Sequence, residues 1–315
     1  MDKKHKFIKK NTWVLIKQYK YLYLLMLIPI VEMIIFNYAP MYGIIVAFKK
    51  FKASQGIWGS EWVGLKWFNS FIFNSYFWKT FKNTFLLGTY SLLWSFPAPI
   101  ILALLLNEIR VARFKKIVQT VTYLPYFISM VAICSMVIAI LSPTTGAVNQ
   151  LLKTFGFESI YFMTEPKYFR SIYIISGIWQ GVGWGTIIYL AALAGVDQEL
   201  YEAATIDGAN RFHKMWYISL SSIKPTISIL LILAVPGILG ANFEKVLLLY
   251  NEVTFETADV MSTYLYRLAF GTLKVAGGQV EQGAAIGLFN SVISFVLILF
   301  SNKASKFFDN SASLW

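Results

Sequence analysis

The chain has 315 residues, of which 57% are hydrophobic and only 14% are charged. Soluble domains typically carry about 25% charged residues, so this composition excludes an ordinary water-soluble globular protein and indicates a membrane protein. The 28 lysines and arginines outnumber the 16 acidic residues, which gives a formal net charge of +12. Because this excess is not gathered into one basic face, membrane topology accounts for it better than a nucleic-acid partner does.

The N-terminal segment predicts a cytoplasmic tail followed by a first membrane span. Residues 1–20 carry seven lysines and one acid, and no small-residue cleavage site follows the next apolar run, so we expect a tail and not a removable signal peptide. The span Tyr21–Tyr38 is just long enough for the hydrocarbon layer, which takes about 20 residues. Glu32, the only acid within a predicted span, either faces a water-filled path or another helix, or lies near the outer headgroups.

The second and third predicted spans enclose a basic loop. Phe48–Lys82 is aromatic and basic, which is typical of a segment that lies flat on the outer membrane surface. Thr84–Leu106 is uncharged and forms the expected second span. The loop Asn107–Lys116 has four basic residues and one acid, and short loops of this kind stay in the cytoplasm. Ile117–Leu141 is the expected third span, broken near Pro125.

The fourth predicted span, Ser171–Val196, has a regular glycine pattern. Gly177, Gly181 and Gly185 recur at every fourth residue and predict one smooth face for close contact with another helix. A fifth span is expected at residues 225–243 and a sixth at 283–301. Residues 21–302 would then form the transmembrane domain, and residues 303–315 a cytoplasmic C-terminal tail.

A few polar and aromatic side chains within or beside these spans are candidates for lining a substrate path. Aromatic and amide groups inside a membrane can bind sugar rings by stacking and hydrogen bonding, although a tryptophan is more often part of the core. The candidates are Trp179, Gln180, Trp184, Asn242, Glu244 and Asn290.

No catalytic or metal site is predicted. The chain has no Gly-Lys-Ser/Thr phosphate-binding motif, its single cysteine, Cys134, lies in an apolar run, and His5 and His213 lie far apart in the sequence. We therefore expect no enzymatic activity, no metal and no cofactor bound by this chain.

Residues 197–222, here named the coupling segment, form the most polar long stretch in the second half of the chain and predict a helix-turn-helix. Asp197 can cap the first helix, and Gly208 can end it because glycine tolerates a positive φ. A second helix with Phe212 on it would start from Ala209. The charge pattern places this segment in the cytoplasm, between the fourth and fifth spans.

The coupling segment resembles the EAA motif of binding-protein-dependent ABC importers, in which Glu-Ala-Ala is followed three residues later by glycine. Glu202, Ala203, Ala204 and Gly208 occupy these positions. The resemblance implies a peg that docks in a cleft of an ATPase subunit, and an amphipathic loop on the bilayer surface is the alternative. Importers often carry a proline shortly after the second helix, whereas here Pro225 follows only after Ser-Ser-Ile-Lys. The sequence therefore defines the last residue of the second helix only to within a few residues. We assign ATPase coupling to Glu202, Ala203, Ala204, Asp207, Gly208, Ala209 and Phe212.

Further runs extend the resemblance over nearly the whole chain, toward the LplB-like branch of the carbohydrate (maltose-type) importer permeases. They are Tyr38–Ile44, Gln119–Pro125, Gly183–Gly185, Tyr189–Leu193, Leu248–Asn251, Glu256–Asp259 and Ser313–Trp315.

This resemblance implies an all-α polytopic protein with six transmembrane helices in the type I ABC importer permease fold and both termini in the cytoplasm. It also implies a second homologous permease, two ATPase subunits that use ATP and Mg²⁺, and an extracellular lipid-anchored binding protein that delivers an oligosaccharide. Two other classes stay open: a secondary transporter, which would need intramembrane acids or a repeat pair, and a membrane scaffold without transport activity.

Overall fold

The computed structural model describes residues 15, 17–270 and 279–308, with side chains described as far as Lys303. Most of the predicted N-terminal tail, part of the predicted outer loop and the end of the C-terminal tail, Ser311 included, lie outside the described residues. The described chain is almost entirely helical, and one short antiparallel pair, β1 (Lys49–Lys50) with β2 (Glu61–Trp62), is its only sheet. The predicted all-α class is confirmed.

Four helical segments are long and apolar enough to cross a membrane: Lys20–Phe48, Ser75–Asn107, Pro166–Ala194 and Val280–Lys303. Two pairs of helices are bent, Ala112–Phe127 with Met130–Ile140 by 103° and Arg211–Ser222 with Lys224–Leu239 by 60°. If each bent pair is one span, the described chain has the six predicted spans. The larger bend follows Pro125, where a proline-containing 3-10 turn replaces the regular helix.

Two predicted boundaries are wrong. The first span does not end at Tyr38 but continues to Phe48, and the second begins at Ser75 instead of Thr84. Residues 75–82, expected to lie flat on the surface, form the first turns of a spanning helix in which Phe77 packs inward. Phe77 is fully buried and contacts Phe71 and Phe289, with ring centroids 4.6 and 5.6 Å away.

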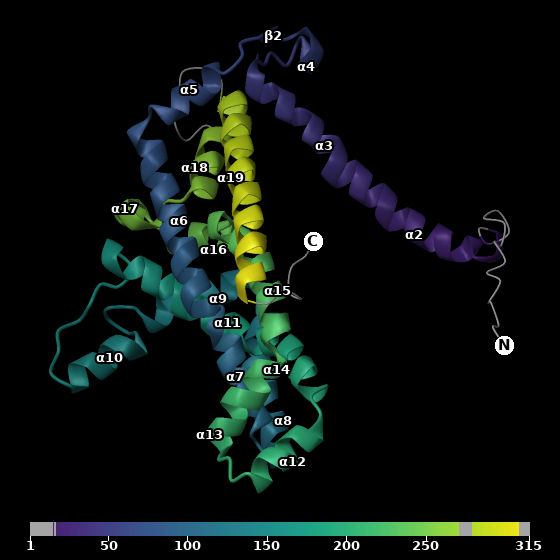
Figure 1. Ribbon diagram of the computed structural model, residues 1–315. Coiled ribbons are helices and arrows are strands. Elements are labelled where there is room, and N and C mark those ends of the chain that lie inside the picture. The colour runs from purple at the N-terminus through teal and green to yellow at the C-terminus, as the bar shows by residue number, and fades with distance from the viewer. Residues whose placement is uncertain (1–14, 16, 271–278, 309–315) are drawn as a thin grey trace, which may run out of the picture.

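Figure 1 labels the elements of the chain. Before the second span lie α2 (Lys20–Met33), α3 (Ala39–Met41), the 3-10 segment η2 (Tyr42–Phe48), α4 (Gly56–Gly59) and α5 (Lys66–Ile72). The middle of the chain forms α6 (Ser75–Ser95), α7 (Pro97–Asn107), α8 (Ala112–Tyr123), α9 (Met130–Ile140), α10 (Ala147–Thr154) and α11 (Pro166–Ala194). The remainder forms α12 (Gln198–Ile206), α13 (Arg211–Lys214), α14 (Leu220–Ser222), α15 (Lys224–Ala234), α16 (Phe243–Leu249), α17 (Phe255–Ala258), α18 (Met261–Ala269) and α19 (Gln279–Phe308).

Buried side chains gather in three clusters along the length of the molecule. The first joins α5, α6, α18 and α19 around Phe71 and Phe77. The second joins α6, α9, α11 and α16 around Leu87 and Val246. The third joins α7, α11 and the start of α15 around Tyr189. In Figure 1 they follow one another from the end of the molecule that holds α5 to the end that holds α12 and α13.

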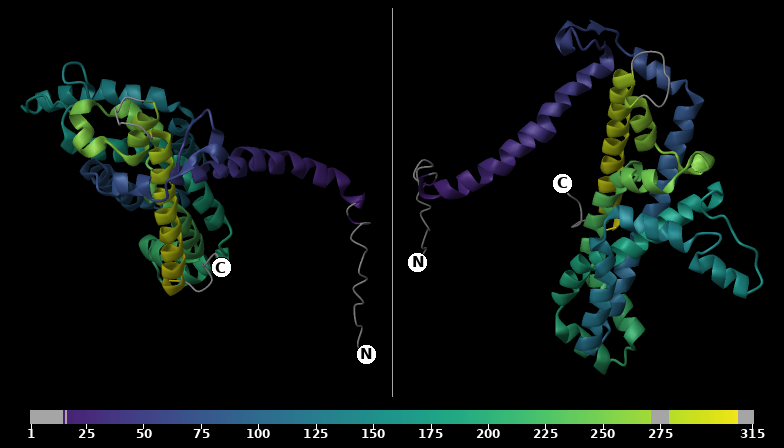
Figure 2. Two further views of the ribbon diagram at one scale, coloured as in Figure 1. Left: turned by 90° about the horizontal axis from the view of Figure 1, so that it is seen from above. Right: turned by 180° about the vertical axis from the view of Figure 1, so that it is seen from behind.

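The N-terminal helix α2 stands apart from these clusters. It extends away from the rest of the chain in all three ribbon views (Figures 1 and 2). None of its residues is buried, and apolar side chains such as Tyr21, Leu25 and Ile28 are 69%, 68% and 73% exposed. An apolar helix of this length needs lipid or another protein to cover it.

The long helix α11 contacts α7 more extensively than any other element does. The glycines make this packing possible, but they are not the set expected from the sequence. A Cβ on Gly183 would lie 2.1 Å from the Thr122 carbonyl oxygen, and one on Gly185 would lie 2.7 Å from the Pro99 ring. A Cβ on Gly181 would meet no atom of the described residues within 4 Å, so Gly177, Gly181 and Gly185 do not form one contact surface among them.

We expect Gly183→Ala to lower the midpoint of thermal unfolding of the purified protein, because the methyl group would push α11 away from the backbone of α8. Overpacking of this kind typically costs about 1–3 kcal/mol. Gly181→Ala is the matched control on the same helix and should leave the midpoint nearly unchanged, since it meets open space. Equal midpoints for the two variants would contradict the close contact at Gly183.

Candidate functional site

The coupling segment forms the predicted helix-turn-helix. Asp197 caps α12 by accepting a hydrogen bond from the backbone N–H of Glu199 at 3.0 Å. Gly208 then adopts a φ of +78°, and the N–H groups of Gly208 and Ala209 donate to the carbonyl oxygens of Thr205 and Ala204 at 3.1 and 2.8 Å. This is the Schellman arrangement that ends helices at glycine.

Two side-chain contacts hold the helices of this segment together. The hydroxyl groups of Tyr201 and Ser219 lie 2.9 Å apart, and Lys214 Nζ donates to Thr205 Oγ1 at 3.2 Å. The second helix begins at Arg211, two residues later than expected, because Asn210 caps α13 through the N–H of His213. The angle between the helices is therefore set by the turn and by contacts on both sides of it.

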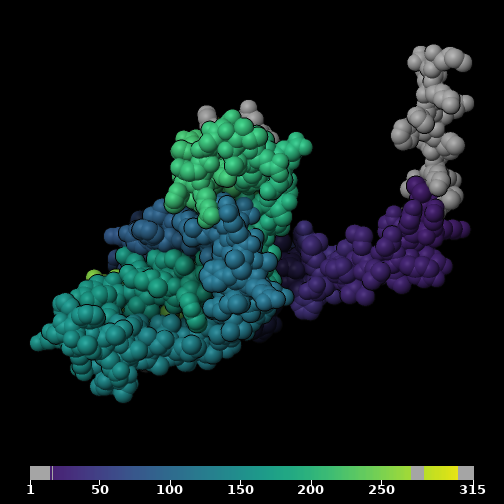
Figure 3. Space-filling model, turned by 90° about the horizontal axis from the view of Figure 1, so that it is seen from below, coloured from purple at the N-terminus to yellow at the C-terminus, as the bar shows by residue number. Residues whose placement is uncertain are grey.

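The tip of the coupling segment exposes apolar side chains. Ile206, Phe212 and Trp216 are 87%, 75% and 63% exposed, and Glu202 and Ala203 are exposed as well. Figure 3 views the molecule from this end and shows the segment in green, uncovered by any other part of the described chain. A rigid turn with exposed apolar residues is typical of a protein-docking surface.

A second feature is a polar cavity of about 220 Å³ beside α11. It brings together two of the predicted path residues, Gln180 and Asn242. Its full lining is Ser91, Ser95, Met130, Tyr173, Ile174, Gly177, Gln180, Asn242 and Lys245.

Tyr173 links α16 to α11 at this cavity. Its hydroxyl oxygen accepts a hydrogen bond from the backbone N–H of Asn242 at 3.0 Å, and its carbonyl oxygen accepts one from Lys245 Nζ at 2.8 Å. The ammonium group also lies 4.8 Å from the centre of the Tyr173 ring, a cation–π contact. Gly177 leaves room for this group, since a Cβ there would lie 3.1 Å from Lys245 Nζ.

The other four predicted path residues lie elsewhere. Trp179 lines a separate apolar cavity of about 460 Å³ between α9, α10 and α11. Trp184 stacks on Tyr126, with ring centroids 4.5 Å apart, so it packs α11 against the turn after α8. Glu244 is exposed at the start of α16, and Asn290 lies on α19 with its Oδ1 atom buried and unbonded within the described residues.

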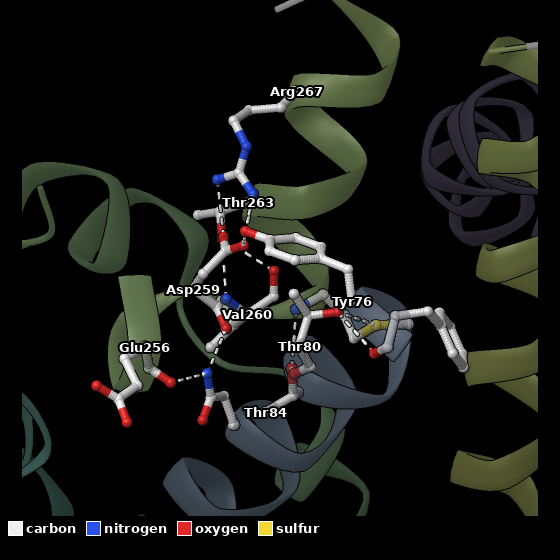
Figure 4. Close-up of polar contacts among 11 residues, drawn as sticks. Tyr76, Thr80, Thr84, Glu256, Asp259, Val260, Thr263 and Arg267 are labelled. Carbon is white, nitrogen blue, oxygen red and sulfur yellow. Dashed lines mark hydrogen bonds and ion pairs between the residues drawn. The ribbon is translucent and has the colours of Figure 1, made fainter. Parts of the chain in front are cut away.

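A third polar cluster joins α17 and α18 to α6, and Figure 4 shows its side chains converging on Asp259. The carboxylate, only 1% exposed, accepts hydrogen bonds from Arg267 Nη1 at 2.8 Å, from Thr263 Oγ1 at 2.7 Å and from the Tyr76 hydroxyl. Asn83 Nδ2 donates to the backbone oxygen of Asp259 at 3.1 Å. We name these five residues the Asp259 network; it fixes α18 onto the first half of α6, which begins at Ser75.

The comparisons with known proteins agree with this architecture. Residues 95–312 match the family described as the binding-protein-dependent transport system inner membrane component. The chain belongs to this family. It is 42% identical to Protein LplB of Bacillus subtilis (strain 168), over 93% of this chain and 91% of that protein. It is also 42% identical to the polygalacturonan/rhamnogalacturonan transport system permease protein YteP of the same organism, over 95% of this chain and 92% of that protein.

Solved structures lead to the same family. The chain superposes with a TM-score of 0.84 and 40% identity on a chain of a bacterial ABC transporter involved in the import of the acidic polysaccharide alginate, covering 94% of this chain and 99% of that one. A second structure is that of a bacterial alginate ABC transporter in complex with a periplasmic protein that holds an alginate pentasaccharide. The chain superposes on it with a TM-score of 0.85 and 39% identity, covering 96% of this chain and 99% of that one. The chain is therefore an inner-membrane permease of the ABC importer class, and permease subunits of this class are not themselves enzymes.

Sequence reasoning missed three buried, hydrogen-bonded charged residues of this permease, Lys245, Asp259 and Arg267. Lys245 was passed over although it lies three residues after Asn242 in an apolar stretch, a pattern that itself marks a buried charge with a special environment. Asp259 stood out only as the last residue of the run Glu256–Asp259, and Arg267 was not among the candidate site residues. Their common partner Tyr76 lies 183 residues before Asp259, and no local pattern indicates that contact.

We expect Arg267→Met to destabilise the permease strongly, because it leaves the Asp259 carboxylate buried without its cation. Breaking a buried ion pair from one side costs about 3–5 kcal/mol. Tyr76→Phe removes one hydrogen bond to the same carboxylate and should cost about 1–3 kcal/mol. Thermal unfolding of the purified variants measures both, and a midpoint for Arg267→Met at or above that of Tyr76→Phe would contradict this ranking.

Proposed function

We propose that this chain is one of two permease subunits of an importer that carries an oligosaccharide into the cell, driven by ATP hydrolysis in two partner ATPase subunits that use Mg²⁺. The observation that carries the proposal is the coupling segment, a rigid helix-turn-helix with exposed apolar side chains at one end of a membrane-spanning bundle. Family membership and the names of the relatives support the class of cargo. They favour this function over a secondary transporter or a scaffold.

A second permease is the proposed partner of the exposed helices. The most apolar stretch of the first span has no residue buried against the described part of this chain. Contact with a homologous permease would cover part of this surface and close a path between the two subunits. The oligosaccharide would pass along that path.

An extracellular lipid-anchored binding protein is the proposed partner at the opposite end. The segment from β1 to α5 exposes large aromatic side chains there, among them Trp58 and Phe73 at 79% and 86% exposure. One of the similar structures contains a periplasmic protein with bound pentasaccharide, which supports a partner of this kind. Opening and closing of the path would follow from movement of the ATPases transmitted through the coupling segment.

The orientation, with the coupling segment and both termini in the cytoplasm, predicts which positions react from outside. In a background with Cys134 replaced by alanine, Asn69→Cys on α5 should be labelled by a membrane-impermeant thiol reagent in intact cells. Gln198→Cys on α12 should be labelled only after the cells are opened. Both side chains are exposed, and α5 and α12 lie at opposite ends of the molecule in Figure 1. The reverse labelling would overturn the orientation.

The docking proposal predicts different defects for two substitutions in the coupling segment. Ala203→Trp places a bulky ring where a close contact is proposed, so less ATPase should copurify with a tagged permease, by an overpacking cost of about 1–3 kcal/mol. Gly208→Pro is incompatible with the φ of +78° and should change the turn while α12 remains, so ATPase binding is partly kept but uptake into vesicles is lost.

The matched control is Asn69→Trp, an exposed position at the other end of the molecule. It should retain the full complement of ATPase. Normal assembly and normal uptake for both coupling-segment variants would show that the segment is an ordinary surface loop.

A further inference from the structure

The polar cavity beside α11 contains a buried charge without a counter-ion. Lys245 is only 3% exposed, yet no carboxylate of the described residues forms an ion pair with it, and no aspartate or glutamate lines the cavity. The ammonium group makes one hydrogen bond within the described residues, to the Tyr173 carbonyl oxygen, which leaves two of its three donors without a partner there.

Burial of a charge costs free energy unless it is paired. The hydrogen bond to one carbonyl oxygen could be made equally well by a neutral amide or hydroxyl donor, which would avoid most of this cost, and a single cation–π contact offsets only a small part of it. Lys245 lies on α16, between the fifth and sixth spans, and burial lowers its pKa to about 8, so the ammonium remains mostly charged at pH 7. The cavity therefore holds a positive charge that the described protein does not neutralise.

Further polar groups around Lys245 are also without partners. The side chains of Ser91 and Ser95 on α6 and of Gln180 on α11 line the same cavity and make no hydrogen bonds within the described residues. Hydroxyl and amide groups arranged around one cation suit an anion that carries hydroxyl groups. A sugar acid has this combination, with a carboxylate for the ammonium and ring hydroxyls for the serines and the amide.

We propose that this cavity is a subsite for a sugar carboxylate and that the oligosaccharide carried by the permease is acidic, with Lys245 pairing with one carboxylate during passage. The proposal rests on the proposed import function and narrows its cargo to oligosaccharides that contain uronate residues. Tyr173 holds the ammonium in place from the side of α11, and Gly177 leaves the space that the ammonium occupies.

The test compares acidic and neutral forms of the same sugar. The complete importer, with partner permease, ATPases and binding protein, is reconstituted in vesicles, and uptake is measured for oligouronides of three to five residues and for the same oligosaccharides with their carboxyl groups reduced to alcohols. Lys245→Gln should lower the ratio of acidic to neutral uptake by about tenfold or more, the range expected for loss of a charged hydrogen bond. Gln180→Glu should lower this ratio as well, because its carboxylate would pair with Lys245.

Lys167→Gln is the matched control, since it removes one positive charge from an exposed lysine on the same helix α11, outside the cavity. Its uptake ratio should equal that of the wild type. Because a binding protein can itself select the cargo, thermal unfolding of the permease–ATPase complex is measured in parallel without binding protein, with each sugar added at millimolar concentration. The oligouronide should raise the midpoint for the wild type and not for Lys245→Gln or Gln180→Glu.

The outcomes separate the inference from the function on which it rests. If the wild type imports only the neutral oligosaccharides, or if Lys245→Gln and Gln180→Glu lower acidic and neutral uptake equally, the carboxylate subsite is wrong while the importer function stands. If the complete complex hydrolyses ATP but takes up neither form and neither sugar shifts its unfolding, the oligosaccharide function fails and the subsite fails with it.

Discussion

Gly183 brings the backbone of α11 against the Thr122 carbonyl on α8, at a distance that no side chain allows, while Gly185 admits the Pro99 ring of α7. These contacts fix the position of a helix on which the functional parts of the permease depend. Arg170, near the start of α11, donates to Asn83 of the Asp259 network at 3.0 Å. The middle of α11 supplies one wall of the polar cavity, and its end leads directly to the cap of the coupling segment.

A helix held in this way can transmit movement as a rigid body. α11 runs without a break from Pro166 to Ala194, so displacement of the coupling segment by an ATPase would move the cavity wall with it. On the other side of the cavity, α16 contacts α11 through Tyr173 and through the second buried cluster, and the chain before α16 is broken at Gly240. Movement of α11 relative to α6 would therefore change the shape of the cavity and the surroundings of Lys245.

Features that depend on residues close together in the sequence were predicted, and features that depend on contacts between distant residues were not. The two ends of the first helix of the coupling segment were predicted correctly because a capping aspartate and a glycine with positive φ act on their immediate neighbours, whereas the second helix begins two residues later than expected. The six spans were predicted because hydrophobic length is also a local property. The start of the second span was wrong because Phe77 is buried by Phe289, which lies more than two hundred residues later in the chain.

For the polar side chains, too, the sequence indicated single unusual residues but not which of them lie together. Asn242 and Gln180 were selected because an amide within or beside a predicted span is locally unusual, but nothing local indicates that they share a cavity, since that depends on how α16 folds against α11. The tryptophans were selected because aromatic rings can stack on sugar rings, and they turned out to pack against protein or to line an apolar cavity. In a membrane protein, an aromatic side chain can pack against many apolar surfaces, whereas few groups can offset the free-energy cost of burying an ammonium group. Lys245 is for this reason a stronger indication of the cargo than the aromatic residues are, although the sequence draws attention to them first.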